Sequence, residues 1–247
     1  MIRPLLKTAG AGLLALSLSA CVSLLPKAKD AQTYRFGGNP EAASGPVQVS
    51  PPGAFGVLKA PTGFVRSAAG DQILTVAPGN QTAYIARARW VSPAQVLFDE
   101  ALERAFDADP GRARLISRGE VGKAELVLKL DVRAFEADYL NGAGAPPTVR
   151  VEVRALITRN LDRSLVGDQL FTASVPAGDN RVGAISAAFD KAVAEVLSQV
   201  VVAANAAAPV AATAPAAIAQ PLAGAPPAPR PTTPVAPPVE TPPAAAR

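Results

Sequence analysis

The sequence contains no histidine and only one cysteine, Cys21. The side chains that could do covalent chemistry are therefore hydroxyls, amines, carboxylates and this one thiol. Without histidine there can be no Ser-His-Asp triad, no Cys-His dyad and no histidine metal site. One cysteine also excludes an intramolecular disulfide and a CxxC motif. The EF-hand loop, the P-loop and the GxGxxG fingerprint are absent as well. The sequence therefore points to no catalytic residue, no cofactor and no metal, and predicts that the protein is not an enzyme.

Cys21 stands at the end of a segment with the pattern of an export signal. Arg3 and Lys7 form a short positive region, and an apolar stretch runs from residue 9 to residue 18. That stretch is about half of the ~20 residues that a membrane-spanning helix needs, and it fits the central region of a signal peptide. It ends in small residues that are followed at once by the cysteine: Leu18, Ser19, Ala20 and Cys21.

This ending resembles the lipobox of bacterial lipoproteins, Leu-[Ala/Ser]-[Gly/Ala]-Cys. The resemblance implies cleavage after Ala20, lipid attachment to the Cys21 thiol and acylation of the new amine. Two or three acyl chains hold a protein on a membrane far more firmly than one myristoyl chain, whose binding is marginal. Val22 replaces the Asp that retains enterobacterial lipoproteins on the inner membrane, which implies the outer membrane and a periplasmic face. The alternative is an ordinary secreted protein with an incidental cysteine.

Two carboxylates, Asp99 and Glu103, have the spacing that places both on one face of a helix. General acid–base catalysis needs one such carboxyl with a pKa shifted by burial. Both fall on the polar face of the predicted helix, opposite its apolar stripe, so we interpret them as two solvated acids.

Other charged and aromatic residues have two interpretations each. The single tryptophan, Trp90, lies where a strand enters a helix, which favours core packing over a role as an interface anchor. Alternating charges in two strands predict either a cross-strand ladder or a polar face that is solvated or covered by a helix. The charges of these two strands are Lys129, Asp131 and Arg133 with Arg150, Glu152 and Arg154. The net charge of +4 is too small for a nucleic-acid surface.

The elements that hold these residues follow from periodicity. Apolar and charged residues alternate over residues 125–139, 148–158 and 165–175, which predicts a three-strand antiparallel meander. The phase breaks at Ala134-Phe135 and predicts a bulge there. Shorter strands are expected at 46–50 and 72–76, within a stretch over 34–77 that is rich in Gly and Pro, and at 82–90 and 114–117. In the strand at 82–90 one face is expected to carry Tyr84, Ala86, Ala88 and Trp90.

Two helices complete the predicted body. The first begins at Ser92-Pro93-Ala94-Gln95, a cap, a first-turn proline and a capping-box position, and ends at Asp109-Pro110-Gly111. The second is expected to be capped by residues 178–180 and carries an apolar stripe from Ile185 to Val201. The expected fold is a single α/β domain, a mixed sheet with two main helices packed on it.

The ends of the chain divide it into four predicted parts. Residues 1–20 form the lipoprotein signal peptide, and residues 21–33 form the lipid anchor and a linker. Residues 34–205 form the folded domain. Residues 206–247 are nearly all Ala and Pro, a composition typical of a disordered, extended tail.

The order of these features resembles the ABC-type transport auxiliary lipoprotein family. The residues that carry the resemblance are Tyr34-Arg35-Phe36, ARARWVSP at 86–93, LKLDVRAFE at 128–136 and the helix at 180–199. Together they span about residues 21–205. Members accompany Mce-type lipid transport systems and the paraquat-inducible transport system.

The resemblance implies a non-enzymatic accessory subunit, anchored by its lipid in the cell envelope. Its partners would be an Mce-domain substrate-binding protein and, through it, an ABC permease and an ATPase. A homo-oligomer is also compatible with the family. Two alternatives remain: a module that itself binds and carries lipid, which needs an apolar cavity, and a structural envelope lipoprotein whose tail contacts the cell wall.

Overall fold

A computed structural model describes residues 30–38, 50–117, 119 and 122–208 of the protein. Its strands are β1 (Gln32–Tyr34), β2 (Phe55–Lys59), β3 (Gly63–Phe64), β4 (Gln72–Ala77), β5 (Gln81–Trp90), β6 (Ala113–Ile116), β7 (Ala124–Asp138), β8 (Thr148–Arg159) and β9 (Leu165–Pro176). Its helices are α2 (Ala94–Ala108) and α3 (Val182–Ala206).

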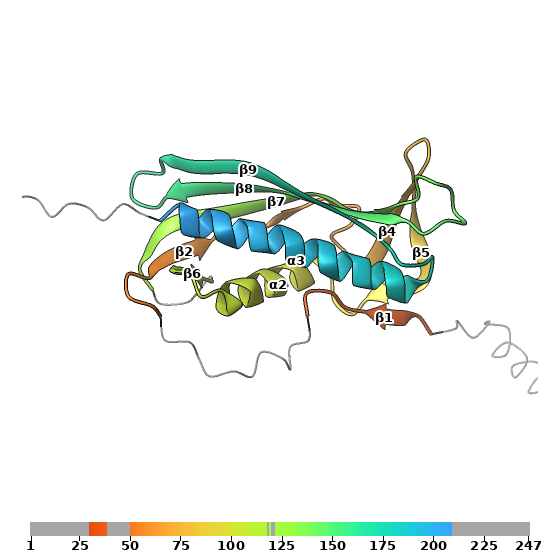
Figure 1. Cartoon of the computed structure of the whole chain (residues 1–247), viewed down its shortest axis with the longest axis horizontal. Coiled ribbons are helices and arrows are strands. Elements are labelled where there is room, and N and C mark those ends of the chain that lie inside the picture. Colours follow the sequence, from red (N-terminus) through yellow and green to blue (C-terminus); the bar gives the residue numbers. More distant parts are fainter. Residues whose placement is uncertain (1–29, 39–49, 118, 120–121, 209–247) are drawn as a thin grey trace, which may run out of the picture. The chain divides into compact units, whose positions relative to one another are not determined.

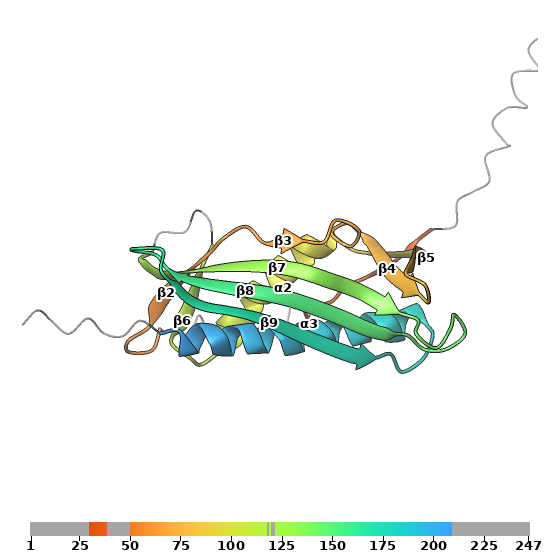
Figure 2. The same ribbon diagram turned by 90° about the horizontal axis from the view of Figure 1, so that it is seen from above.

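All nine strands of the described residues belong to one mixed sheet, which is organised around β7. Along one side β7 pairs antiparallel with β8, from Leu126↔Arg159 to Asp138↔Thr148. Its other side is shared in turn by three short parallel strands, β2, β3 and β4. The sheet ends at β9 beyond β8, and at β6 and β1 on the side of the short strands (Figure 2). The expected mixed sheet is confirmed.

The meander β7–β8–β9 has the predicted alternation. Leu126, Leu128, Leu130 and Val132 of β7 are buried, while the side chains between them lie on the opposite face. The register shifts between Val132 and Ala134, at the position where the broken phase predicts a bulge. The charged residues of these strands therefore share the sheet face that no described helix covers.

Both helices pack on the other face of the sheet (Figure 1). α3 lies along β8 and β9, and α2 lies beside α3. Between them and the sheet is a cluster of aromatic rings. Trp90 is 2% exposed, and its ring packs edge-on against Phe36 and Phe189 at centroid distances of 4.9 and 5.2 Å. The expectation that Trp90 packs in the core is confirmed.

The predicted side-chain caps of the helices are wrong. In α2 the Ala94 and Gln95 amides donate to the Gly70 and Ala69 carbonyls, so backbone from another segment replaces a capping box. α3 begins at Val182, later than expected, with no side-chain cap. At the start of α2, tertiary packing therefore supplies the hydrogen bonds that the sequence pattern assigned to local side chains.

The face predicted for β5 is correct only near its end. Ala88 and Trp90 are buried, but Tyr84 is 43% exposed and its hydroxyl donates to the Ser67 carbonyl. Between Tyr84 and Arg89 the strand has extra residues relative to β4, and Arg87 takes a left-handed φ of 58°. This bulge reverses the alternation, so Ile85 packs against the core instead.

Other differences lie in the Gly- and Pro-rich first part of the body. The strand predicted at 46–50 lies outside the described residues, apart from Ser50. β1, β2 and β3 were not predicted individually, and the first two residues of β1, Gln32 and Thr33, belong to the part predicted as anchor and linker.

Candidate docking surfaces

The residues with the strongest sequence signal lie outside the described part of the chain. These are Cys21 with Leu18, Ser19 and Ala20, and residues 209–247 of the Ala/Pro-rich segment. The first three residues predicted to belong to the tail, Ala206 to Ala208, continue and close α3.

Asp99 and Glu103 face the same side of α2 but bind different partners. The Asp99 carboxylate lies 2.9 Å from Lys59 Nζ and accepts a 2.6 Å hydrogen bond from the Thr62 hydroxyl. Glu103 is exposed and accepts from the Ser117 hydroxyl at 2.9 Å. The interpretation as solvated acids is thus correct for Glu103 and wrong for Asp99, which is half-buried and ties β2 to α2.

The described residues contain no cluster of three or more acidic or cysteine side chains that could hold a metal ion. Nor do Asp99 and Glu103 form a pair that acts on a common proton, since each carboxylate is engaged elsewhere.

The first surface is a groove between α2 and α3 with a volume of about 520 Å³. Its floor and walls are mostly apolar and small, and Val202 at its rim is 66% exposed. The residues that line it include Ala101, Ala105, Val193, Ala194, Leu197 and Val201.

One end of this groove is closed by the backbone of Gly37 and Gly38. The Asp190 carboxylate accepts from both amides, at 2.7 and 3.2 Å, and Arg104 Nε donates to the Gly37 carbonyl at 2.8 Å. Both glycines have φ near +80°, and a Cβ on Gly37 would lie 2.6 Å from the Ala101 Cβ. Glycine at position 37 therefore lets the chain cross between the two helices.

The second surface is the charged face of the meander. Arg150 on β8 contacts Glu136 and Asp138 on β7 and Glu152 on its own strand. Partial burial acts to lower the pKa of Arg150, but the nearby carboxylates outweigh it and hold that pKa above its usual value. Arg150 thus forms a cross-strand ladder, but its partners on β7 are Glu136 and Asp138 and not the expected Lys129, Asp131 and Arg133.

A second ion pair of this face joins β8 to β9. Arg154 Nε donates to Asp168 at 2.7 Å, and a second guanidinium nitrogen donates to the other carboxylate oxygen at 2.5 Å. These hydrogen bonds from Arg154 hold the pKa of Asp168 below its usual value. Because Asp168 is the only charged residue of β9, this bidentate pair leaves the strand without a free charge.

The third surface is the edge of the sheet at β9. This strand has 12 residues, and among the described residues it pairs only with β8. Leu165 and Leu170 on it are 62% and 52% exposed. The strands at the other margins are much shorter, three residues in β1 and four in β6.

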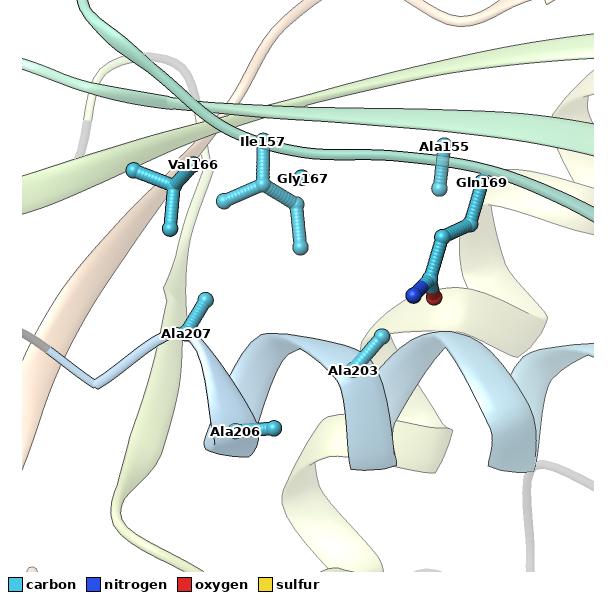
Figure 3. A pocket seen from close by; sticks show the side chains of 8 residues that line it. All are labelled: Ala155, Ile157, Val166, Gly167, Gln169, Ala203, Ala206 and Ala207. Atoms are coloured by element: carbon cyan, nitrogen blue, oxygen red, sulfur yellow. The ribbon is translucent and has the colours of Figure 1, made fainter.

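A small pocket of about 180 Å³ lies between β9 and the end of α3 (Figure 3). Gly167 leaves it open on the sheet side, because a side chain at this position would point towards Ile157 of β8. Its walls are Ala155, Ile157, Val166, Gln169, Ala203, Ala206 and Ala207.

None of the described helices is long and apolar enough to cross a membrane. No curated protein matches the sequence. Two crystal structures share the fold. Protein XCC0632 from Xanthomonas campestris is 23% identical, with a TM-score of 0.57 over 73% of this chain and 96% of that one. An uncharacterized protein is 13% identical, with a TM-score of 0.51 over 69% of this chain and 97% of that one.

The family comparison covers nearly the whole body. Residues 39–201 match the model of the ABC-type transport auxiliary lipoprotein component, a span that begins before β2 and ends five residues before the end of α3. With this match over more than half of its length, the chain belongs to the ABC-type transport auxiliary lipoprotein family.

Proposed function

We propose that this protein is a non-enzymatic accessory subunit of an Mce-like ABC-type lipid transport system, in which it docks the substrate-binding component. The single observation that carries the proposal is the family match over residues 39–201. The described residues support docking, because they offer a groove, a charged face and a free edge for binding.

We further propose the anchor and the boundaries of the working parts. The signal peptide is residues 1–20, and Cys21 carries the lipid, with residues 21–33 as anchor and linker. The domain begins near residue 34 and includes the end of α3, and the Ala/Pro-rich residues that follow α3 form the tail. Val22 after the lipidated cysteine supports placement in the outer membrane, facing the periplasm.

Copurification from native membranes tests the docking function. The full-length protein is crosslinked in intact cells, extracted in mild detergent and purified, and its partners are identified by mass spectrometry. We expect an Mce-domain protein together with its permease or ATPase. The matched control is Cys21→Ser, which removes the acceptor thiol and leaves the body unchanged. This variant is expected to leave the membrane fraction and lose the partners.

Two outcomes would contradict the proposal. Recovery of the wild-type protein without any transport component would contradict docking. Loss of transport on deletion of residues 209–247, with no loss when the groove or the β9 edge is altered, would instead favour the structural role of the tail.

The α2–α3 groove favours a second candidate, direct binding of a lipid chain. Its volume of about 520 Å³ lies within the ~300–1,000 Å³ of ligand pockets, and it is mostly apolar with a few polar groups. The test is photocrosslinking of a diazirine fatty acid to the full-length protein. Val202→Trp at the rim is expected to abolish labelling, whereas Val91→Trp, on an exposed valine outside the groove, is expected to leave it unchanged. Equal labelling of both variants would exclude the groove.

A further inference from the structure

The backbone of β9 turns half of its hydrogen-bonding groups away from the sheet. The Ala177 amide donates to the Pro147 carbonyl at 2.9 Å, and the β8–β9 register continues without a shift from Thr148↔Pro176 to Ile157↔Gly167. In an antiparallel pair, residues that bond to the partner alternate with residues that point outward. The odd-numbered residues of β9 therefore bond to β8. The N–H and C=O groups that face the free edge belong to Asp168, Leu170, Thr172 and Ser174.

This outward-facing stretch has defined ends. At its start the register shift between Ile157 and Thr158 makes Val166 an extra, bulged residue. At its end Pro176 has no N–H to offer. Bulges and prolines are devices that limit strand pairing at an edge. They enclose a window of four outward-facing residues, and the centre of that window is Phe171.

Nothing in the window itself blocks pairing. Natural edges are commonly protected by lysines, by inward-pointing charges or by shortness. β1 and β6 are short, but β9 has 12 residues, no lysine or arginine, and one acid that Arg154 neutralises. A long, uncharged edge of this kind is a template for another strand.

The chain that follows α3 is not suited to fill this edge. Figure 2 shows the sheet from the face opposite the helices. When the sheet is turned over so that the helices face the viewer and β9 runs upward, β8 lies to the right of β9 and the free edge lies to its left. A strand that left α3 and paired parallel to β9 on that side would complete a left-handed crossover. About 98% of such connections are right-handed. The rarity of this connection favours an occupant from another molecule.

We propose that the occupant is a second copy of this chain, which pairs antiparallel with β9 about a two-fold axis at Phe171. The window is symmetric about this residue, so all four outward-facing residues are used in both copies. Asp168 lies opposite Ser174 of the partner subunit, and Leu170 lies opposite the partner's Thr172. No like charges meet, because the only charged residue of the strand faces a hydroxyl.

The same register brings an apolar side chain to the small pocket between β9 and α3. On the helix face Phe171 meets its own copy, and Gly167 lies opposite the partner's Val175. Gly167 has no side chain, and the pocket beside it, about 180 Å³ in volume, is lined by Ile157, Val166, Gln169 and alanines (Figure 3). Opposed residues of antiparallel strands have Cβ atoms about 4.5–5.5 Å apart, so the partner's valine extends over this gap.

The position of α3 is compatible with the arrangement. α3 lies over β8 and β9, and neighbouring strands are about 4.8 Å apart. The two-fold axis is perpendicular to the sheet, so it places the α3 helices of both copies on the same face. Their axes would be about 10 Å apart, which is a normal distance for packed helices.

Cysteine crosslinking of the full-length protein in its native membranes tests the register. Phe171→Cys is expected to form a disulfide-linked dimer on mild oxidation. Ser174→Cys alone is expected to give none, because the two Ser174 positions are about 20 Å apart along the strands. Coexpressed Ser174→Cys and Asp168→Cys chains are expected to join. Leu161→Cys at the exposed turn between β8 and β9 is the control that reports random collision.

A proline variant gives an independent test. Thr172→Pro removes an N–H that faces the free edge and is not bonded to β8, so the subunit keeps its fold. Sedimentation of the purified full-length protein in detergent is expected to show a dimer for the wild type and for Thr172→Val. For Thr172→Pro we expect an apparent Kd at least tenfold higher, with an unchanged melting temperature.

Two results would overturn the proposal. The first is a wild-type protein that is monomeric at all concentrations, which would leave the edge to a different partner. The second is an oligomer, including a ring, that Thr172→Pro does not weaken and in which Phe171→Cys forms no crosslink.

Discussion

At the scale of single residues, Gly37 and Gly38 separate the effect of backbone conformation from that of a close contact. Both have φ near +80°, but only Gly37 lies against Ala101. The left-handed conformation costs an alanine about 1 kcal/mol, and overpacking costs ~1–3 kcal/mol more. We therefore expect Gly37→Ala to lower the free energy of unfolding clearly more than Gly38→Ala, measured by urea denaturation. Equal effects would mean that the contact with Ala101 is relaxed at no cost.

The Arg154–Asp168 pair predicts a specific pH dependence. Arg154 lowers the pKa of Asp168 in the folded state, so the pair stabilises the fold above the usual carboxyl pKa. That stabilisation is lost as the pH falls through the lowered value. We expect Arg154→Gln to raise the pKa of Asp168 towards normal, observed by carboxyl ¹³C NMR. An unchanged titration would show that Asp168 does not depend on Arg154.

At the scale of elements, the bulge in β5 stores strain at one residue. Arg87 has a φ of 58° and forms no ion pair among the described residues, whereas Arg89 pairs with Asp71 at 2.8 Å. A non-glycine residue in this region costs ~1–3 kcal/mol. Thermal unfolding is expected to show that Arg87→Gly stabilises the protein, and that Arg89→Gly, without strain to relieve, destabilises it. The idea of strain fails if Arg87→Gly lowers the melting temperature.

The same elements show what sequence can predict. β7, β8 and β9 were found because each has more than ten residues with one alternating face, and the helices because their stripes run through several turns. β2 and β3 were missed, since five and two residues that include glycine give no period to detect. The bulge at Arg87 was missed because it comes from pairing with β4, and neither Gly nor Asn marks it.

The binding surfaces were less predictable than the strands. The groove depends on Asp190 reaching the Gly37 amide, a contact across 153 positions of the sequence. No local sequence pattern predicts such a contact. The charged face of β7 and β8 was predicted because charges alternate within each strand, but the partners of Arg150 depend on the register, as does the edge window of β9.

At the scale of the whole molecule, the body should be stable without the tail. The last polar contacts between α3 and the body are made by Asn205, which accepts from the Arg112 and Ala113 amides and donates to Asp109. A chain that ends after Ala208 is therefore expected to melt within a few degrees of the full-length protein. A chain that ends after Ala204 loses these bonds and about 2–3 kcal/mol, measured by calorimetry. Equal melting of the two shortened chains would contradict this assignment.

The central place of β7 also has a consequence for folding during export. β2, β3 and β4 precede β7 in the chain, yet each pairs with it, across some 60 to 70 residues for β2 and β3. If the chain crosses a membrane from its N-terminus, β2, β3 and β4 emerge before β7 and cannot pair with it until β7 has also emerged. Such non-local pairing belongs to the slower folding class, milliseconds to seconds. Until residue 138 has emerged, most of the sheet has no template, and the exposed strands need protection from one another.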